Sequence, residues 1–153
     1  MRGWGSAALV VCFVALVTLP SSGAMMGMDL VGSIKTQLKT ASFHAGELAQ
    51  KANAIGAVKL HSQHTINCLE GPTGAHFVQA VGYPCQGQGH GILPDLKAAV
   101  AAKVPGAQDA WDDANIALNL LLQARDMSDI MQAQPWDKVV AEYLAKASSD
   151  LGP

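Results

Sequence analysis

Histidine and cysteine side chains gather in one short stretch of this 153-residue chain. Four of the five histidines and two of the three cysteines lie there, namely His61, His64, Cys68, His76, Cys85 and His90. Imidazole nitrogens and thiolates are the side-chain groups that bind transition metals and haem, and two cysteines can also bind each other. The stretch is therefore the predicted site, but these residue types alone name no reaction.

The third cysteine, Cys12, lies in an N-terminal segment that has the features of a signal peptide. An apolar run from Ala7 to Leu19 has the length of a signal-peptide core and is short for a membrane-spanning helix. Small residues around Ala24 fit cleavage after that position. We therefore expect residues 1–24 to be a signal peptide and residues 25–153 to be one mature domain, with an uncleaved anchor as the alternative.

Export would carry Cys68 and Cys85 into a compartment where disulfides persist, the periplasm or the extracellular medium. We therefore predict that these two cysteines pair. On the loop-entropy model, such a bridge stabilises the fold by roughly 3 kcal/mol. The alternative keeps both as thiolates on Cu(I) or Zn, although the chain has no second Cys-x-x-Cys pair to complete such a site.

The composition favours helices and argues against nucleic acid as a partner. Without Arg2, nine basic residues face twelve acidic ones, a net charge near −3. No basic patch appears, and the few aromatic residues are not interleaved with arginine or lysine. Alanine is abundant and β-branched residues are sparse, which favours helix. We expect no nucleic-acid partner, no membrane association after signal cleavage, and leave a protein partner open.

Apolar residues recur at steps of three and four, which predicts an all-α bundle of about four main helices. The first helix is expected over roughly 29–54, with a seam from Ile34 to Ile55. A single bent helix through Glu70 is the alternative to a turn near Asn53. The remaining expected elements are helices over 57–69 and 94–103, one with its apolar stripe from Ala110 to Leu121, and one over 135–148 followed by a frayed tail from Ser149.

Residues 71–93 are too rich in glycine and proline for regular structure, so we predict a long loop. Loops of that length inside a compact domain are usually functional or disordered. Here the predicted Cys68–Cys85 bridge would tie the loop back to the helix that precedes it. We therefore expect the Gly-rich loop to be ordered.

His61, His64 and Cys68 are predicted to share one face of their helix, because together they span only about 60° of its circumference. The bridge would draw the loop over that face and bring His90 and His76 toward the first two histidines. Neutral imidazoles in such an arrangement suit Cu(II), Zn(II) or Ni(II). His61, His64, His90 and His76 are thus the candidate metal ligands, although their spacing matches no established zinc motif.

A haem interpretation uses some of the same residues. If the chain turns near Asn53, His44 could face His61 or His64 across two antiparallel helices, and two imidazoles could then ligate a b-type haem. Covalent c-type attachment is excluded, because Cys-x-x-Cys-His does not occur.

One run of residues, followed by the Gly-rich segment, resembles a pattern in small exported bacterial helical proteins of uncharacterised function: His61-x-x-His64-x-x-Asn67-x-x-Glu70-Gly71. The resemblance covers about a quarter of the chain and implies export, helices and an ordered loop, but no substrate. The last three residues of the run also have a structural explanation. Asn can hydrogen-bond a returning loop, and Gly is the usual left-handed stop of a helix.

No enzyme is expected, since the chain contains no nucleophile elbow, phosphate-binding loop, dinucleotide fingerprint or His-Glu-x-x-His motif. The predicted function is transition-metal binding by an exported helical bundle, with Cu or Zn as the candidate ion, for sensing, delivery or protection. Redox chemistry at a bound metal stays open. The main alternative is a metal-free binding or scaffolding module whose disulfide-fixed loop meets a protein or a small ligand.

Overall fold

The computed structural model describes residues 22–153, with side chains from Asp29 onward, and all regular elements in that part are helical. They are α1 (Ser22–Ser42), the π-helical segment η1 (Phe43–Leu48), α2 (Ala49–Lys51), α3 (Ile55–Glu70), the 3-10 turn η2 (Gln79–Val81), α4 (Ile92–Ala101), α5 (Ala107–Arg125) and α6 (Ile130–Asp150). The predicted all-α bundle with a tethered loop is confirmed. The predicted signal peptide, residues 1–24, lies almost wholly outside the described residues. Among the helices from Ser22 onward, none has the length and apolar character needed to cross a membrane.

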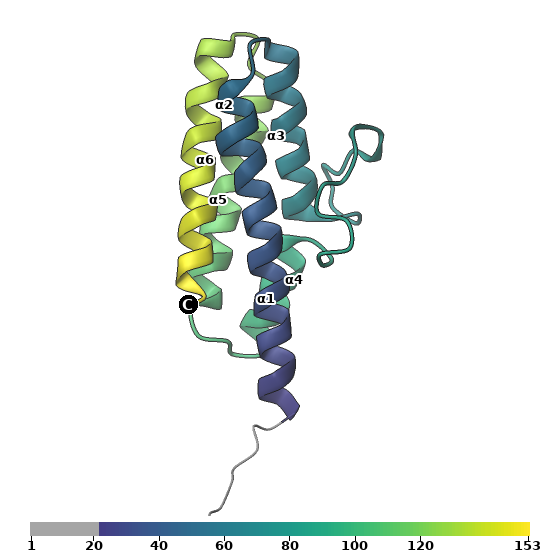
Figure 1. Ribbon diagram of the computed structural model, residues 1–153, viewed down its shortest axis with the longest axis vertical. Coiled ribbons are helices and arrows are strands. Elements are labelled where there is room, and N and C mark those ends of the chain that lie inside the picture. Colours follow the sequence, from purple (N-terminus) through teal and green to yellow (C-terminus); the bar gives the residue numbers. More distant parts are fainter. Residues whose placement is uncertain (1–21) are drawn as a thin grey trace, which may run out of the picture.

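Four long helical rods lie side by side in the bundle (Figure 1). The first rod joins α1, η1 and α2 without a break, and the others are α3, α5 and α6. The short α4 packs against α1 and α5, and the Gly-rich loop projects beyond α3. The loop therefore lies on one side of the bundle, beside the helix that carries most of the predicted site.

Alanine forms much of the interface between the rods. Its small side chain lets helix backbones approach closely, so little volume separates them. Gly46 in η1 extends this effect, because a Cβ atom there would lie 3.1 Å from the Cβ of Ala141 on α6. The fully buried alanines include Ala41, Ala45, Ala49, Ala99, Ala107, Ala110, Ala114, Ala117 and Ala147.

The chain turns between α2 and α3, so the alternative of one bent helix through Glu70 is wrong. Ala52 and Ala54 have extended backbone conformations, with ψ of 138° and 141°. The carbonyl groups left open at the end of α2 are satisfied by α6. The Nε2 of Gln134 donates to the carbonyl oxygens of Ala49, Gln50 and Ala52. This side-chain cap holds the hairpin that sets the first rod against α3.

The π-helical segment shifts the buried face of the first rod. The heptad-like seam predicts Leu48 as a core position, but Leu48 is half-buried and Ala49 is fully buried instead. In η1 the amide of Ala49 donates to the carbonyl of His44, five residues earlier, and the wider turn delays the seam by one residue. Short π segments are rare and are frequent at functional sites. His44 lies in this one.

Both ends of α6 differ from the prediction. The helix begins at Ile130 rather than near Pro135, because the carboxylate of Asp129 caps it by accepting from the amide of Met131 at 2.8 Å. It continues to Asp150, and the tail does not fray. Leu151 is 7% exposed, and the ammonium group of Lys35 donates to the carbonyl of Gly152. Contacts with α1 thus anchor the C-terminal residues.

A buried carboxyl group lies between α3 and α6. Asp137 is fully buried, and the hydroxyl of Ser62 donates to its Oδ1 at 2.9 Å. Burial raises the pKa of Asp137 to about 7, and the Ser62 hydrogen bond opposes that rise. Its native pKa therefore lies above the ordinary value of 3.8. The native state holds a proton that the unfolded state releases, so the free energy of unfolding falls as the pH rises through this window.

We expect Asp137→Asn to remove this pH dependence. Relative to the native chain, the substitution should increase the free energy of unfolding by on the order of 2–3 kcal/mol more at pH 8 than at pH 5. Urea unfolding at the two pH values measures the difference. Asp126→Asn is the matched control, because the Asp126 side chain is 78% exposed and should give no such change. An equal effect of Asp137→Asn at both pH values would contradict the assignment.

Candidate metal centre

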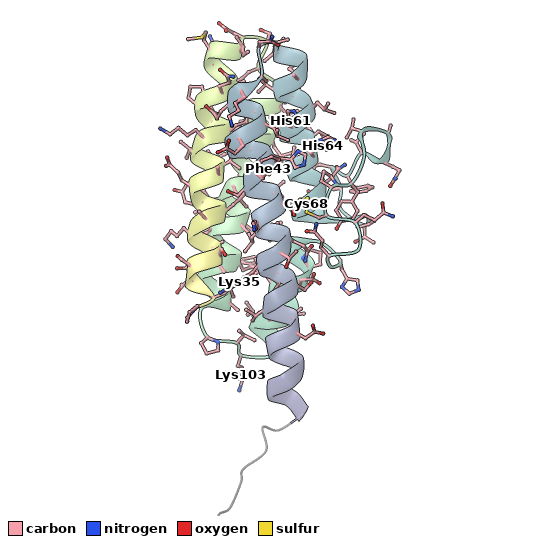
Figure 2. The ribbon with its side chains drawn as sticks, in the orientation of Figure 1. Lys35, Phe43, His61, His64, Cys68 and Lys103 are labelled. Carbon is pink, nitrogen blue, oxygen red and sulfur yellow. A yellow bond between two sulfur atoms is a disulfide. The ribbon has the colours of Figure 1, made fainter. Side chains whose placement is uncertain are left out.

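Three histidines from two antiparallel helices meet on the side of the bundle that carries the loop. His44 comes from η1, and His61 and His64 come from successive turns of α3. Figure 2 shows His61 and His64 next to the first rod, beside Phe43. Each of the three side chains is half-buried, and one ligand nitrogen from each lies within 4.8 Å of the other two. The cluster could hold a metal ion.

The closest pair in the cluster is His44 and His61, whose Nδ1 atoms lie 3.3 Å apart. Two imidazole nitrogens on a tetrahedral zinc ion, each about 2.0–2.1 Å from the metal, are separated by about 3.3 Å. The pair thus has the spacing of one edge of a tetrahedral site. The ring centroids of His44 and His64 are 4.8 Å apart, and those of His61 and His64 are 5.7 Å apart. If the His64 ring moved closer to this pair, the three nitrogens could form one face of a tetrahedral site.

The surroundings favour the neutral form of His44 and of His61. Burial lowers the pKa of His44 from 6.5 to about 4, and repulsion from His64 and His61 adds to the effect. Burial, followed by repulsion from His64, also lowers the pKa of His61. A neutral imidazole offers one nitrogen lone pair, which a protonated ring does not. At neutral pH, His44 and His61 are therefore in the state that binds metals.

The structure identifies the ligand atom that His64 offers. The Nε2 of His64 lies 2.6 Å from the carbonyl oxygen of Val81, which can only accept, so Nε2 carries the proton and donates. Its Nδ1 then holds a lone pair, and this atom is buried without a hydrogen-bond partner. Metal-binding histidines commonly donate their other ring N–H to a backbone carbonyl, which fixes the tautomer. His64 has this arrangement.

Asn67 holds the turn that supplies the Val81 carbonyl. Its side-chain nitrogen donates to the carbonyls of Val78 and Gly82 at 2.9 and 2.6 Å, and its oxygen accepts from the amide of Val78 at 2.9 Å. Asn67 is fully buried on α3, one turn after His64. One side chain thus fixes three backbone groups that flank η2. By holding this turn, Asn67 positions the Val81 carbonyl that accepts from His64.

The predicted disulfide is confirmed, with the Cα atoms of Cys68 and Cys85 5.3 Å apart. The alternative in which both cysteines are metal-bound thiolates is therefore wrong. Gly71 ends α3 with φ of 68°, as predicted for a helix stop. The loop returns so closely there that a Cβ atom on Gly71 would lie 1.8 Å from the carbonyl oxygen of His90. The residue at this position must be glycine.

His76 and His90, the two predicted loop ligands, are not brought into the three-histidine cluster. The Nδ1 of His76 lies 2.6 Å from Oε1 of Glu70, which is 9% exposed. The Nδ1 of His90 lies 3.0 Å from Oδ1 of Asp95. Both carboxylates also accept the backbone N–H of their histidine. The disulfide orders the loop as expected, but these carboxylates fasten each loop histidine at its own place.

His44 takes the place that the loop histidines were expected to fill. Sequence reasoning placed it near His61 or His64 only for a haem site, and only if the chain turned near Asn53. In an antiparallel hairpin, residues at equal distances from the turn lie side by side, and His44 and His61 are nine and eight residues from Asn53. The Nδ1 atoms of this pair are 3.3 Å apart, which is closer than two nitrogens on opposite faces of one haem iron would lie.

Comparison of the chain with known protein families, with curated protein sequences and with solved structures finds no match. The resemblance to small exported helical proteins therefore stays a prediction. The site has to be interpreted from its own geometry.

The low pKa of His44 is open to direct measurement. In the metal-free protein, the ring carbon-bound protons of His44 should titrate near pH 4 in NMR spectra. In His64→Gln the titration should move upward, because one source of repulsion is lost, but it should stay below 6.5, because burial is the larger cause. His90→Gln, which alters a 91% exposed ring, should leave the His44 titration unchanged. A His44 titration near 6.5 in the native chain would contradict the buried cluster.

The role of Asn67 can be tested with two substitutions. Asn67→Ala removes the side-chain partner of the three loop backbone groups and should lower the free energy of unfolding by about 2–3 kcal/mol. Asn67→Asp retains the acceptor for Val78 N–H but loses both donations, so it should also release the Val81 carbonyl from His64. Faster exchange of the His64 Nε2 proton in both variants is the expected NMR signature. Exchange at the native rate in a folded variant would show that Asn67 does not position His64.

Proposed function

We propose that the protein binds a transition metal ion through His44, His61 and His64, and does so in an oxidising compartment outside the cytoplasm. The buried, unpartnered Nδ1 of His64 carries this proposal. A lone pair away from water without a hydrogen bond costs about 1–3 kcal/mol, and a bound cation would remove that cost. The proton on Nε2 is held by the Val81 carbonyl, so the lone pair of the neutral ring lies on Nδ1 and is the one available to an ion.

The chemistry of the donor set favours Cu(II) or Zn(II). Imidazole nitrogen suits both ions, whereas Mg²⁺ and Ca²⁺ prefer oxygen ligands. Three neutral imidazoles would not offset the charge of the ion and would fill only three of its coordination positions. A further ligand would complete the site. The Cys68–Cys85 bridge supports export, since disulfides persist in oxidising compartments. Within this proposal the protein senses, delivers or sequesters the ion and is a binding protein rather than an enzyme.

A metal-free binding module is the second candidate, and the loop favours it. The loop is fixed by a disulfide and by buried side chains, yet Val78 within it is 38% exposed. A rigid loop with an exposed apolar residue loses little conformational entropy when it meets a partner. In that function, the histidine cluster would be a packing feature with no ion.

Metal analysis of the protein from an oxidising compartment separates the two candidates. The native chain should bind one Zn(II) or Cu(II) per chain in competition with a chromophoric chelator. His44→Ala, His61→Ala and His64→Ala should each lower the affinity by more than the roughly 10–100-fold that loss of an outer-shell partner costs, and the double variant at positions 61 and 64 should retain no ion. His90→Ala is the matched control, because its ring is 91% exposed and lies outside the cluster.

Unchanged metal content in the His61→Ala, His64→Ala double variant would overturn the metal proposal. An absorption spectrum with a Soret band would instead identify haem as the ligand of the cluster.

A further inference from the structure

The three histidines leave a fourth coordination position to be filled. Within residues 22–153, the group of ligating side chains in reach of one another contains His44, His61 and His64 and no further His, Cys, Asp or Glu. Zn(II) is almost always four-coordinate in proteins, and Cu(II) takes at least as many ligands. The fourth ligand is therefore a water molecule or a group from outside this cluster.

His76 has the hydrogen-bond arrangement of a metal-binding histidine, although it lies outside the cluster of its own chain. Its Nδ1 donates to the buried carboxylate of Glu70 at 2.6 Å, so the lone pair lies on Nε2. A carboxylate that receives one ring N–H, with the other nitrogen free, is the usual arrangement behind a metal-bound histidine. The side chain is 40% exposed, so another molecule can reach it.

His76 and the cluster lie on the same side of the bundle. Gln63, next to His64 on α3, donates from its Nε2 to the carbonyl of His76 at 2.8 Å, and to the Oδ1 of Asn67 at 3.1 Å. The loop segment of His76 is thus fastened to the same helix that supplies His61 and His64. Figure 1 shows this loop standing out from α3, away from α5 and α6.

The chain segment that contains most of α3 and the loop is nearly free of charge. Between Lys59 and Asp95, the single Asp, Glu, Lys or Arg is Glu70, which is buried and paired with His76. Two exposed apolar side chains belong to α3 and the loop: Leu60 is 39% exposed and Val78 is 38% exposed. Phe43 contacts the ring of His44 edge-on, with centroids 6.1 Å apart. Depletion of charge around apolar residues is characteristic of interface cores.

A second copy of this chain fits such a face. In a two-fold interface each patch meets its own counterpart, so charged residues near the axis would repel and an uncharged face would not. The two-fold axis also relates the two metal sites, so each copy can supply one ligand to the ion of the other copy and receive one in return. The clamped loop keeps the ordering cost of such an interface small.

We propose that the metal-loaded protein is a two-fold dimer in which His76 of each copy binds, through Nε2, the ion held by His44, His61 and His64 of the other copy. This inference rests on the proposed function and adds the partner of the site. The dimer holds two ions, and each ion joins the two copies.

Sedimentation velocity with and without one equivalent of Zn(II) tests the proposal. The native chain should be monomeric without metal, dimeric with it, and monomeric again after a chelator is added. His76→Gln should still bind Zn(II) but remain monomeric, and its amide can replace the hydrogen bond to Glu70, which protects the fold. His90→Gln is the matched control, because its ring is also paired to a buried carboxylate, and it should dimerise like the native chain.

A mixing experiment removes any effect of the substitution on folding. His76→Gln retains the three-histidine cluster but lacks the donated ligand, while the His61→Ala, His64→Ala chain retains His76 but lacks the cluster. Together they should form a mixed dimer with one Zn(II), which neither chain forms alone.

Two results would overturn the dimer. A native chain that binds Zn(II) one to one and stays monomeric would remove it and leave the proposed function intact, as would a His76→Gln chain that dimerises like the native protein. A native chain that binds no metal would remove the proposed function as well.

Discussion

The backbone of the Gly-rich loop has to find hydrogen-bond partners without regular structure, and the rest of the site depends on how it does so. A loop held against a helical bundle cannot leave its amide and carbonyl groups away from water unsatisfied. Side chains from the helices supply the missing partners. Asn67, Glu70 and Gln63 of α3 bind the first half of the loop, and Gln37 of α1 and Asp95 of α4 bind the second half. The Cys68–Cys85 bridge lies between these two groups of contacts.

These hydrogen bonds connect the loop to the position of the proton on His64. Asn67 fixes the turn, the turn presents the Val81 carbonyl, and that carbonyl holds the proton of His64 on Nε2. Across the helix hairpin, the π-helical segment sets His44 against His61 at 3.3 Å. Burial, with repulsion from neighbouring protonated rings, lowers the pKa of His44 and of His61, so both rings are neutral at neutral pH. Neutral imidazoles whose nitrogens lie this close together could share one cation.

Local patterns predicted most of the fold, and long-range contacts account for what they missed. Apolar periodicity, Gly71 as a helix stop, and an even cysteine count after export led to the bundle, the loop and the disulfide. Proline is common in a first turn, which placed the start of α6 near Pro135, whereas the capping carboxylate of Asp129 starts the helix at Ile130. The anchored tail depends on the contact of Lys35 with Gly152, which no local window contains.

The candidate site was predicted in part, for the same reason. His61 and His64 share a helix face, which spacing alone determines, whereas His44 joins them only once the turn near Asn53 and the π segment are known. The expectation that His76 and His90 would reach the cluster relied on the disulfide alone. It did not include Glu70 and Asp95, whose buried carboxylates satisfy the loop amides and hold each ring beside them.

The run from His61 to Gly71 thus separates into two sets of residues with different explanations. Asn67, Glu70 and Gly71 are required by the fold, since each satisfies the loop backbone or permits its close approach. The run also holds two histidines, which join His44 in the cluster, and one of them, His64, donates from Nε2 to the Val81 carbonyl of the loop. An apolar side chain at position 44 or 61 would avoid the lowered pKa of a buried imidazole, whereas one at position 64 would remove the unpartnered Nδ1 but would leave the Val81 carbonyl without this donor. The spacing of the three rings is compatible with a bound metal ion.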